Sequence, residues 1–257
     1  MAKPSATRSI EAVEAQIVSV DAADPFVKVL VYGRNGSGKT RFAASAPKVL
    51  LIDIHEEGTR SAKGTGAMKF PKKGQITWPQ VGQVYWYLKA GNHDFDAVAI
   101  DTVTALNRLC LRMVMGEAED RDPNRELGMP DRRAYGRAGE LMREQLLAFR
   151  NLPMHVIFTA QERVITDEDG EEPVLHTPDL PAGSRGIAMG SVGVIGRIYR
   201  QEVKIRNKTT KKVTTRWEDR LLVGPHETYD TKDRTNNLGD VVRRPTMADI
   251  IAANNQE

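Results

Sequence analysis

Short runs of apolar residues alternate with longer amphipathic segments along most of this chain. Four runs are rich in β-branched residues and cover residues 26–32, 49–53, 97–101 and 155–159. Uninterrupted apolar runs of this length predict strands that are buried on both faces of a sheet. Because helical segments separate the runs, the pattern predicts an α/β fold in which helices cover both faces of a mostly parallel central sheet.

The segments between the predicted strands carry helix start and stop signals. Thr77 is placed to cap a helix, Pro79 falls in its first turn and Gly91 follows its end, the usual positions of these residue types. A second helix is predicted after Asp101 and a third over residues 133–150. One face of the third is largely apolar, and it consists of Ala138, Leu141, Met142, Gln145 and Phe149.

The pattern changes after residue 163. Residues 166–196 are rich in Gly, Pro, Asp and Glu, which predicts a long excursion or a hairpin. Antiparallel strands are predicted over residues 194–205 and 217–223, and a short terminal helix over 246–253. We therefore expect three parts: a flexible arm at 1–24, one α/β domain at 25–245 and a helical tail at 246–257.

Composition adds few constraints. Hydrophobic residues make up 40% and charged residues 28% of the 257 residues, an ordinary balance for a chain with a buried core. The single cysteine, Cys110, lies at helical spacing among apolar residues and is predicted to be a core thiol in a reducing compartment. No apolar run approaches the roughly 20 residues that span a membrane, so we expect a cytoplasmic protein.

The clearest motif is a glycine-rich loop between the first predicted strand and a helix. Residues 33–40 read GRNGSGKT and match the pattern G-x-x-x-x-G-K-T. In such a loop backbone N–H groups and the helix N-terminus bind phosphates, while Lys39 reaches the β- and γ-phosphates and Thr40 binds Mg²⁺. We expect nucleotide contacts from Gly33, Arg34, Asn35, Gly36, Ser37, Gly38, Lys39, Thr40 and Arg41.

A magnesium site also needs an acid that ends a buried strand. Asp101 fits, and Asp53 fits by pattern alone. Asp101 is favoured, because one whole strand–helix unit separates it from the loop, although a carboxylate there could instead cap the next helix. The sequence therefore predicts Thr40 and Asp101 as the metal-binding pair.

Hydrolysis needs a group that orients water. The acids after the second strand, Asp53, Glu56 and Glu57, are candidates, and Thr159 and Gln161 at the end of the fourth strand are placed to sense the γ-phosphate. All of them belong to the carboxyl ends of predicted parallel strands, where α/β sheets bind ligands. Residues 207–210 read NKTT and lack the aspartate of a guanine-reading N-K-x-D element, so ATP is favoured over GTP.

Together these motifs resemble the RecA-like P-loop ATPases, most closely the phage-encoded AAA-type nucleotide-binding proteins related to core-only recombinases and single-strand annealing ATPases. The resemblance covers roughly residues 26–240. It rests on the loop, on residues 52–53 (ID) with Glu56 and residues 58–59 (GT) after them, and on residues 101–102 (DT). Further matches are residues 158–162 (FTAQE), 192–197 (VGVIGR) and 232–236 (KDRTN).

The resemblance implies a three-layer αβα fold in which the sensor strand lies between the loop strand and the Asp101 strand. It also implies Mg²⁺-dependent ATP hydrolysis, assembly into a homo-oligomeric ring or filament and action on single-stranded DNA, with a single-strand binding protein as a candidate partner. Glu56 matches the water-activating glutamate of this family, although the longer spacing after Asp53 leaves Glu57 open. Lys232 and Arg234 match a basic pair that reaches the γ-phosphate held by a neighbouring subunit.

Basic residues gather in one later segment. Residues 197–216 contain eight Lys or Arg and one acid, Glu202, a stripe that could neutralise DNA phosphates or remain an exposed hairpin without a partner. The DNA-binding candidates are Arg185, Lys204, Arg206, Lys208, Lys211 and Lys212. Tyr199 and Trp217 could stack on bases, but alternation along a strand favours rings that point inward.

No separate DNA-binding domain is evident, which favours annealing or loading over strand exchange. Two other classes of function stay open at this point. One is a small-molecule kinase that uses the same loop, although the sequence offers no compact arginine lid. The other is a nucleotide-dependent regulator that neither hydrolyses ATP nor binds DNA.

Overall fold

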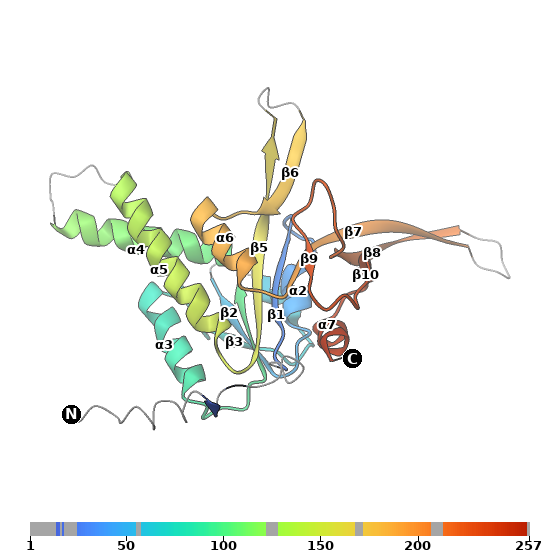
Figure 1. Cartoon of the computed structure of the whole chain (residues 1–257), viewed down its shortest axis with the longest axis horizontal. Helices are drawn as coiled ribbons and strands as arrows, with labels where there is room; N and C mark the ends of the chain where they lie inside the picture. Colours follow the sequence, from blue (N-terminus) through green and yellow to red (C-terminus); the bar gives the residue numbers. More distant parts are fainter. Residues whose placement is uncertain are drawn as a thin grey trace.

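The computed structural model of the chain describes residues 14, 15, 17, 25–54, 58–121, 128–167, 172–206 and 213–255. Within these residues a single ten-stranded sheet has the strand order β10-β8-β7-β1-β5-β4-β2-β3, with β6 paired to β5 and β9 paired to β7 (Figure 1). The parallel part consists of β1 (Lys28–Gly33), β5 (His155–Thr166), β4 (Ala97–Asp101), β2 (Val49–Asp53), β3 (Met68–Phe70) and the start of β7 (Val194–Arg206).

The strands predicted at residues 49–53 and 97–101 are confirmed at those bounds. The sensor strand β5 lies between β1 and β4, as the family resemblance implied. The sheet therefore brings the ends of β1, β5 and β4 side by side at one rim, with Gly33 opposite Gln161 and Asp101 opposite Thr159.

Helices cover both faces of the sheet. One face is packed by α3 (Trp78–Lys89), α4 (Val103–Arg121), α5 (Arg132–Arg150) and α6 (Ala182–Gly190). The other is packed by α2 (Lys39–Ala43), η2 (Gly58–Ala62) and α7 (Met247–Asn254). Alternate side chains of β1 divide between the two faces, with Leu30 and Tyr32 on one and Val29 and Val31 on the other. This is the predicted three-layer α/β fold.

The predicted helix with Thr77 at its start and Gly91 after its end is confirmed as α3. Thr77 caps α3 in a capping box with Gln80, and Gly91 follows the helix with φ of +75°. Asp131 caps α5 by accepting a hydrogen bond of 2.7 Å from the backbone N–H of Ala134. The predicted terminal helix is α7, and its first backbone N–H donates to Ser45 Oγ at 2.8 Å. Burial raises the pKa of the Cys110 thiol to about 12, as expected for a core cysteine.

The segment after residue 163 is more ordered than the sequence suggested. Strand β5 continues to Thr166 and pairs with β6 (Pro173–Pro178) in an antiparallel hairpin. Helix α6 then follows, although its glycines argued against a helix, because Ser184 and Ala188 are buried in the core. The sequence predicted the hairpin and missed this helix.

An antiparallel arm extends from the side of the sheet that lies beyond β1, away from β5. We call β7 and β8 (Val213–Leu222) together the β7–β8 arm, which projects well beyond the remaining strands (Figure 1). Strand β7 pairs with β1 only from Val194 to Arg197. Two short strands, β9 (Lys232–Asp233) and β10 (Val241–Arg243), were not predicted, because two or three residues carry no periodicity. No helix in the described part of the chain is long and apolar enough to cross a membrane.

Candidate active site

The glycine-rich loop connects β1 directly to α2. Gly36 and Gly38 have φ of +75° and +103°, a left-handed conformation that costs side-chain-bearing residues energy. The loop lines an open cleft of about 1150 Å³ at the carboxyl rim of the sheet. Five arginines also line the cleft, against the two acids Asp101 and Glu162: Arg34, Arg41, Arg60, Arg108 and Arg200. The excess of positive charge suits a polyphosphate.

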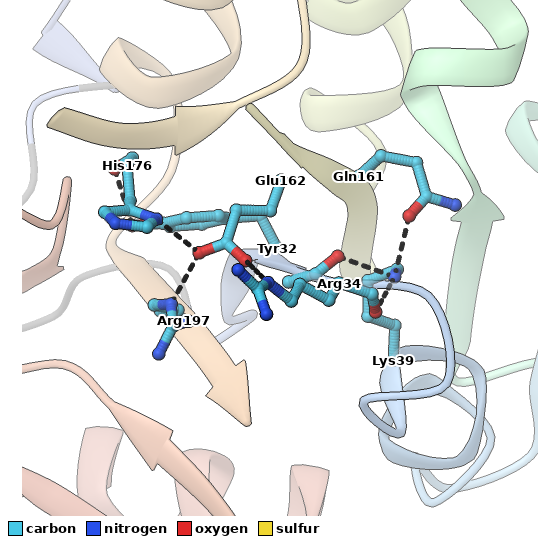
Figure 2. A network of polar contacts seen from close by, with 8 residues as sticks. Tyr32, Arg34, Lys39, Gln161, Glu162, His176 and Arg197 are labelled. Atoms are coloured by element: carbon cyan, nitrogen blue, oxygen red, sulfur yellow. Dashed lines mark hydrogen bonds and ion pairs between the residues drawn. The ribbon is translucent and has the colours of Figure 1, made fainter. Parts of the chain in front are cut away.

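Lys39 lies between this loop and the end of β5. Its Nζ donates to the carbonyl oxygens of Gly33 at 2.8 Å and Arg34 at 2.9 Å, and to Gln161 Oε1 at 3.1 Å (Figure 2). Only 6% of Lys39 is exposed. The structure thus brings the predicted phosphate-binding lysine and the predicted sensor Gln161 into direct contact.

Thr40 and Asp101 meet at the same rim. Thr40 Oγ1 donates to Asp101 Oδ2 at 2.6 Å, and Thr159 Oγ1 donates to Asp101 Oδ1 at 2.5 Å. Burial raises the pKa of Asp101, while these two hydrogen bonds and the charge of Lys39 oppose that rise. Three residues that the sequence assigned to metal binding and γ-phosphate sensing therefore form one connected group.

Asp53 occupies a different environment, although it lies opposite Asp101 on the neighbouring strand. Its Oδ2 accepts from Thr59 Oγ1 at 3.2 Å and lies 3.8 Å from Lys69 Nζ. It lines a smaller cavity rather than the phosphate cleft. The geometry therefore favours Asp101 over Asp53 as the partner of Thr40, in agreement with the order of the strands in the sequence.

Gly58 closes the corner around Thr40 and Asp101, and the sequence analysis assigned it no structural role. A Cβ at this position would lie 2.6 Å from Thr40 Oγ1 and 3.2 Å from Asp101 Oδ2. Any side chain would therefore displace Thr40 and Asp101, the predicted metal-binding pair. A glycine just beyond the acidic end of β2 was the available signal, but its neighbours in space cannot be read from the sequence.

Thr40 and Asp101 fit a magnesium ion chemically. A hydroxyl and a carboxylate oxygen are hard ligands of the kind Mg²⁺ prefers, and Mg²⁺ in nucleotide sites takes few protein ligands besides phosphate and water. No group of three His, Cys, Asp or Glu residues in the described ranges is placed to hold a metal by itself. Glu56 and Glu57 lie outside the described residues. On either side of them, Ile54 donates its backbone N–H to the Asp101 carbonyl at 2.9 Å, and Gly58 approaches the Asp101 carboxylate.

A known protein family covers the residues that build this site. The family model described as "AAA domain" matches residues 26–235. The chain belongs to the AAA domain family. A solved KaiC-like protein from the hyperthermophilic archaeon Pyrococcus horikoshii OT3 is similar, with 13% identity over 85% of this chain and 89% of that one, and a TM-score of 0.40. No curated protein matches the chain.

The AAA domain holds a second polar group beside the phosphate loop, centred on Glu162 (Figure 2). This carboxylate is 1% exposed, and it accepts from Arg197 Nε at 2.6 Å and contacts His176 Nδ1 at 3.0 Å. Arg34 Nε of the loop lies 3.7 Å away. Burial acts to raise the pKa of Glu162, but Arg197 and His176 outweigh it and hold the pKa below its usual value. The sequence analysis gave Glu162 no role, although it follows Gln161 directly.

The predicted DNA-binding residues are spread over different parts of the AAA domain. Arg185 lies on α6, within the segment for which the sequence predicted a long excursion or a hairpin. Lys204 is exposed on β7 and Arg206 ends that strand, while Lys208, Lys211 and Lys212 lie outside the described residues. Three other members of the stripe are engaged by acids, since Arg197 binds Glu162, Arg200 Nε lies 3.0 Å from Asp219 Oδ1 and Arg216 lies 3.4 Å from Glu218 Oε2.

Trp217 differs from the expectation that its ring points inward. It is 67% exposed. The reason is that β8 pairs only with β7 at this position, opposite Glu202, beyond the part of β7 that pairs with β1. Alternation buries side chains only where a second layer covers the strand, so an inward position on the arm is not a core position.

Lys232 and Arg234 lie far from the phosphate loop of the same chain. Strand β9 pairs with β7 at Val194 and Ile195, and the backbone N–H of Arg234 donates to the Gly193 carbonyl at 3.1 Å. Arg234 shares a cavity with Phe26 and Lys28 at the amino end of β1. At about 3.3 Å per residue, β1 places this cavity about 16 Å from Gly33. Arg234 is exposed, and Lys232 Nζ donates to the Met189 carbonyl at 2.6 Å.

Proposed function

We propose that this AAA domain binds ATP with Mg²⁺, hydrolyses it, and uses the cycle to act on single-stranded DNA as a homo-oligomer. The observation that carries the nucleotide part is the convergence of Lys39, Thr40, Asp101 and Gln161 at one rim. Phosphoryl transfer depends on positioning and charge stabilisation, and these four side chains supply both.

Each residue has a role that its position permits. Lys39 binds the β- and γ-phosphate oxygens, and Gln161, which contacts Lys39, orients groups at the γ-phosphate. Thr40 and Asp101 hold Mg²⁺, which when bound offsets the negative charge on the β- and γ-oxygens. Thr159 fixes the Asp101 carboxylate. Glu56 is proposed as the residue that activates water, with Glu57 and then Asp53 as the alternatives.

The preference for ATP rests on the missing guanine-reading aspartate in residues 207–210. The proposed action on DNA rests on the basic stripe at 197–216, since the β7–β8 arm extends beyond the sheet and carries Lys204 exposed on it. An arm of this kind suits annealing or loading, because phosphate contacts hold a strand without reading its sequence.

The proposed homo-oligomer rests on Arg234. An exposed arginine at the opposite end of β1 from its own loop can complete a site only in a neighbouring subunit. A cation supplied in trans to the γ-phosphate is a recurrent device in nucleotide hydrolysis. We propose Arg234, assisted by Lys232, for that role.

The test measures phosphate release from ATP by the wild type and by Lys39→Ala, with and without single-stranded DNA, and with magnesium removed by a chelator. The proposal expects turnover that DNA stimulates, and that either the mutation or the chelator abolishes. ATP binding without turnover would indicate a nucleotide-dependent regulator. Transfer of the γ-phosphate to a small molecule would indicate a kinase. Unchanged ATP affinity in Lys39→Ala would remove the loop from the site.

A further inference from the structure

A second cavity opens on the other side of the phosphate loop. Its volume is about 390 Å³, and it lies between α2, strand β8 and the link that precedes α7. Gly38 and Arg41 line both this cavity and the phosphate cleft. The two spaces therefore adjoin at the start of α2, where one extended ligand could reach from one into the other.

The direction of such a ligand follows from the proposed function, on which this inference rests. Thr40, Asp101 and Gln161 mark the end of the cleft where the γ-phosphate reacts. Arg41 is the next residue along α2, is exposed, and leads from the cleft into the second cavity. A nucleotide whose γ-phosphate lies at Lys39 would therefore extend its sugar and base past Arg41.

Another cavity lies beside the first residues of the loop, but it suits a base less well. It is lined by Arg34, Arg197, Tyr199 and Arg200, among others. The Arg197 guanidinium already lies 5.5 Å from the centroid of the Tyr199 ring, so the one aromatic side chain among its described lining residues has a cationic partner.

The second cavity has a wall of a different kind. Trp217 lines it and is 67% exposed, whereas the next residue, Glu218, is 8% exposed. The Glu218 carboxylate lies 3.4 Å from Arg216, 3.3 Å from Arg220 and 3.4 Å from Arg244. These ion pairs fix the backbone beside Trp217, and the charged residues among the described lining are Arg41, Arg216 and Arg244 against Glu218 and Asp219. Ile198, Phe42 and Pro245 supply apolar surface.

We propose that this cavity is the base-binding part of the nucleotide site and that Trp217 is the residue on which the purine ring stacks. An exposed indole next to a polyphosphate site gains most from a flat aromatic ligand, since stacking of a base on an aromatic side chain is favourable and tolerant of base identity. The apolar surface suits a base, and Arg41, which also lines the phosphate cleft, suits the phosphate end of a nucleoside phosphate.

The experiment compares ATP with inorganic tripolyphosphate, which carries the phosphates and no base. Affinities are measured by calorimetry for the wild type, Trp217→Ala, Trp217→Phe and the control Trp86→Ala. Trp86 is 63% exposed on α3 and lines neither cavity. We expect Trp217→Ala to bind ATP about 5- to 100-fold more weakly, because stacking is worth about that much per base. Tripolyphosphate affinity should stay unchanged, and Trp217→Phe should retain most ATP affinity.

A purine preference gives a second measurement. The wild type should bind ATP more tightly than UTP, because a purine has the larger stacking face, and Trp217→Ala should reduce that difference. The proposal is overturned if Trp217→Ala binds ATP as the wild type does, or if it loses tripolyphosphate affinity equally. It is also overturned if the variant loses only single-stranded DNA binding, which would assign the ring to DNA. Wild type that binds neither ATP nor tripolyphosphate would refute the proposed function itself.

Discussion

The carboxyl rim of the parallel strands and the β7–β8 arm hold their polar side chains in different ways. At the rim, Lys39 and Asp101 are 6% and 2% exposed, and each is hydrogen-bonded to a residue of β5. On the arm, Lys204 and Trp217 are exposed, and at their positions each strand pairs only with the other. The rim is therefore an arrangement that the chain completes by itself, whereas the arm presents groups to something else.

This difference separates what the fold decides from what a ligand or partner decides. A buried carboxylate must be satisfied within the protein, so the contacts of Asp101 limit its chemistry strongly. An exposed lysine has no such requirement. Experiments on the rim should consequently change turnover, while those on the arm should change binding.

The largest expected effect tests whether the rim needs an arginine from a neighbouring subunit. Arg234→Ala should reduce ATP hydrolysis about 10³- to 10⁵-fold, the usual contribution of an arginine supplied in trans. Lys39→Ala should also be inactive. An equimolar mixture should regain measurable ATPase, because an intact loop can meet an intact arginine across one interface.

The matched control for this mixture is Arg243→Ala, which removes an exposed arginine of β10, the next strand along the chain, and should leave turnover near the wild-type rate. A mixture that co-assembles and remains inactive would contradict the role in trans. Full ATPase in a dilute monomeric wild type would contradict it as well.

The next prediction concerns the rim and tests which acid activates the attacking water. Glu56→Gln should keep ATP affinity and lower turnover about 10²- to 10⁴-fold, the usual contribution of a general base. Glu57→Gln is the internal control, since it differs by one position. Steady-state turnover and ATP affinity are measured for both. A selective loss in Glu57→Gln would move the assignment by one residue, and normal turnover in both would turn attention to Asp53.

The two regions also differ in how far the sequence predicted them. Strands at 49–53 and 97–101 were found at the expected bounds, because every residue from Ala97 to Asp101 is buried and the apolar run is continuous. Helix α3 was predicted from its cap and its terminal glycine. The order of strands along the chain favoured Asp101 over Asp53 as the magnesium-binding acid, but only the structure shows Thr40 hydrogen-bonded to Asp101.

Contacts between residues distant along the chain were beyond the sequence. Glu162 meets Arg197 and His176, which are 35 and 14 positions away along the chain, and no local pattern encodes such pairing. Helix α6 forms against the local preference of its glycines, because Ala188 is buried. Trp217 was misjudged for the reverse reason, since strand alternation does not reveal whether another layer covers the strand.

A third prediction tests how strongly buried ion pairs hold the rim to the base of the arm. Glu162→Gln leaves Arg197 and His176 without their anionic partner and should lower the free energy of unfolding by roughly 2–4 kcal/mol. The folded-state pKa of Glu162 lies below its usual value. The contribution of the Glu162 charge to the free energy of unfolding is therefore complete above the unfolded-state pKa of about 4.3. It is lost as the pH falls through the lower folded-state pKa.

Urea denaturation near neutral pH and again at about pH 3, well below the unfolded pKa of about 4.3, checks this expectation. The difference between the wild type and Glu162→Gln should shrink at the lower pH. The control Glu144→Gln, at an exposed position of α5, should be close to neutral at both. An equal difference at both pH values would show that the substitution acts through packing and not through charge.

The smallest expected effect concerns the second region of the comparison, the basic stripe of the arm, and tests whether it binds DNA. Changing Lys208, Lys211 and Lys212 together to glutamine should weaken single-stranded DNA binding roughly 10- to 30-fold at about 0.2 M salt, because three cations fewer release fewer counterions. The slope of log affinity against log salt should fall in magnitude by about 2, at roughly 0.7 per contact. ATP hydrolysis without DNA should not change, since none of these lysines is among the proposed phosphate- and metal-binding residues Lys39, Thr40 and Asp101. The matched control changes three exposed lysines outside the arm, Lys63, Lys72 and Lys73. If both triple variants lose the same affinity and slope, binding follows net charge and the arm is not a DNA site. If the arm variant keeps the wild-type slope, the phosphates are held elsewhere, and Arg185 on α6 is the next residue to test.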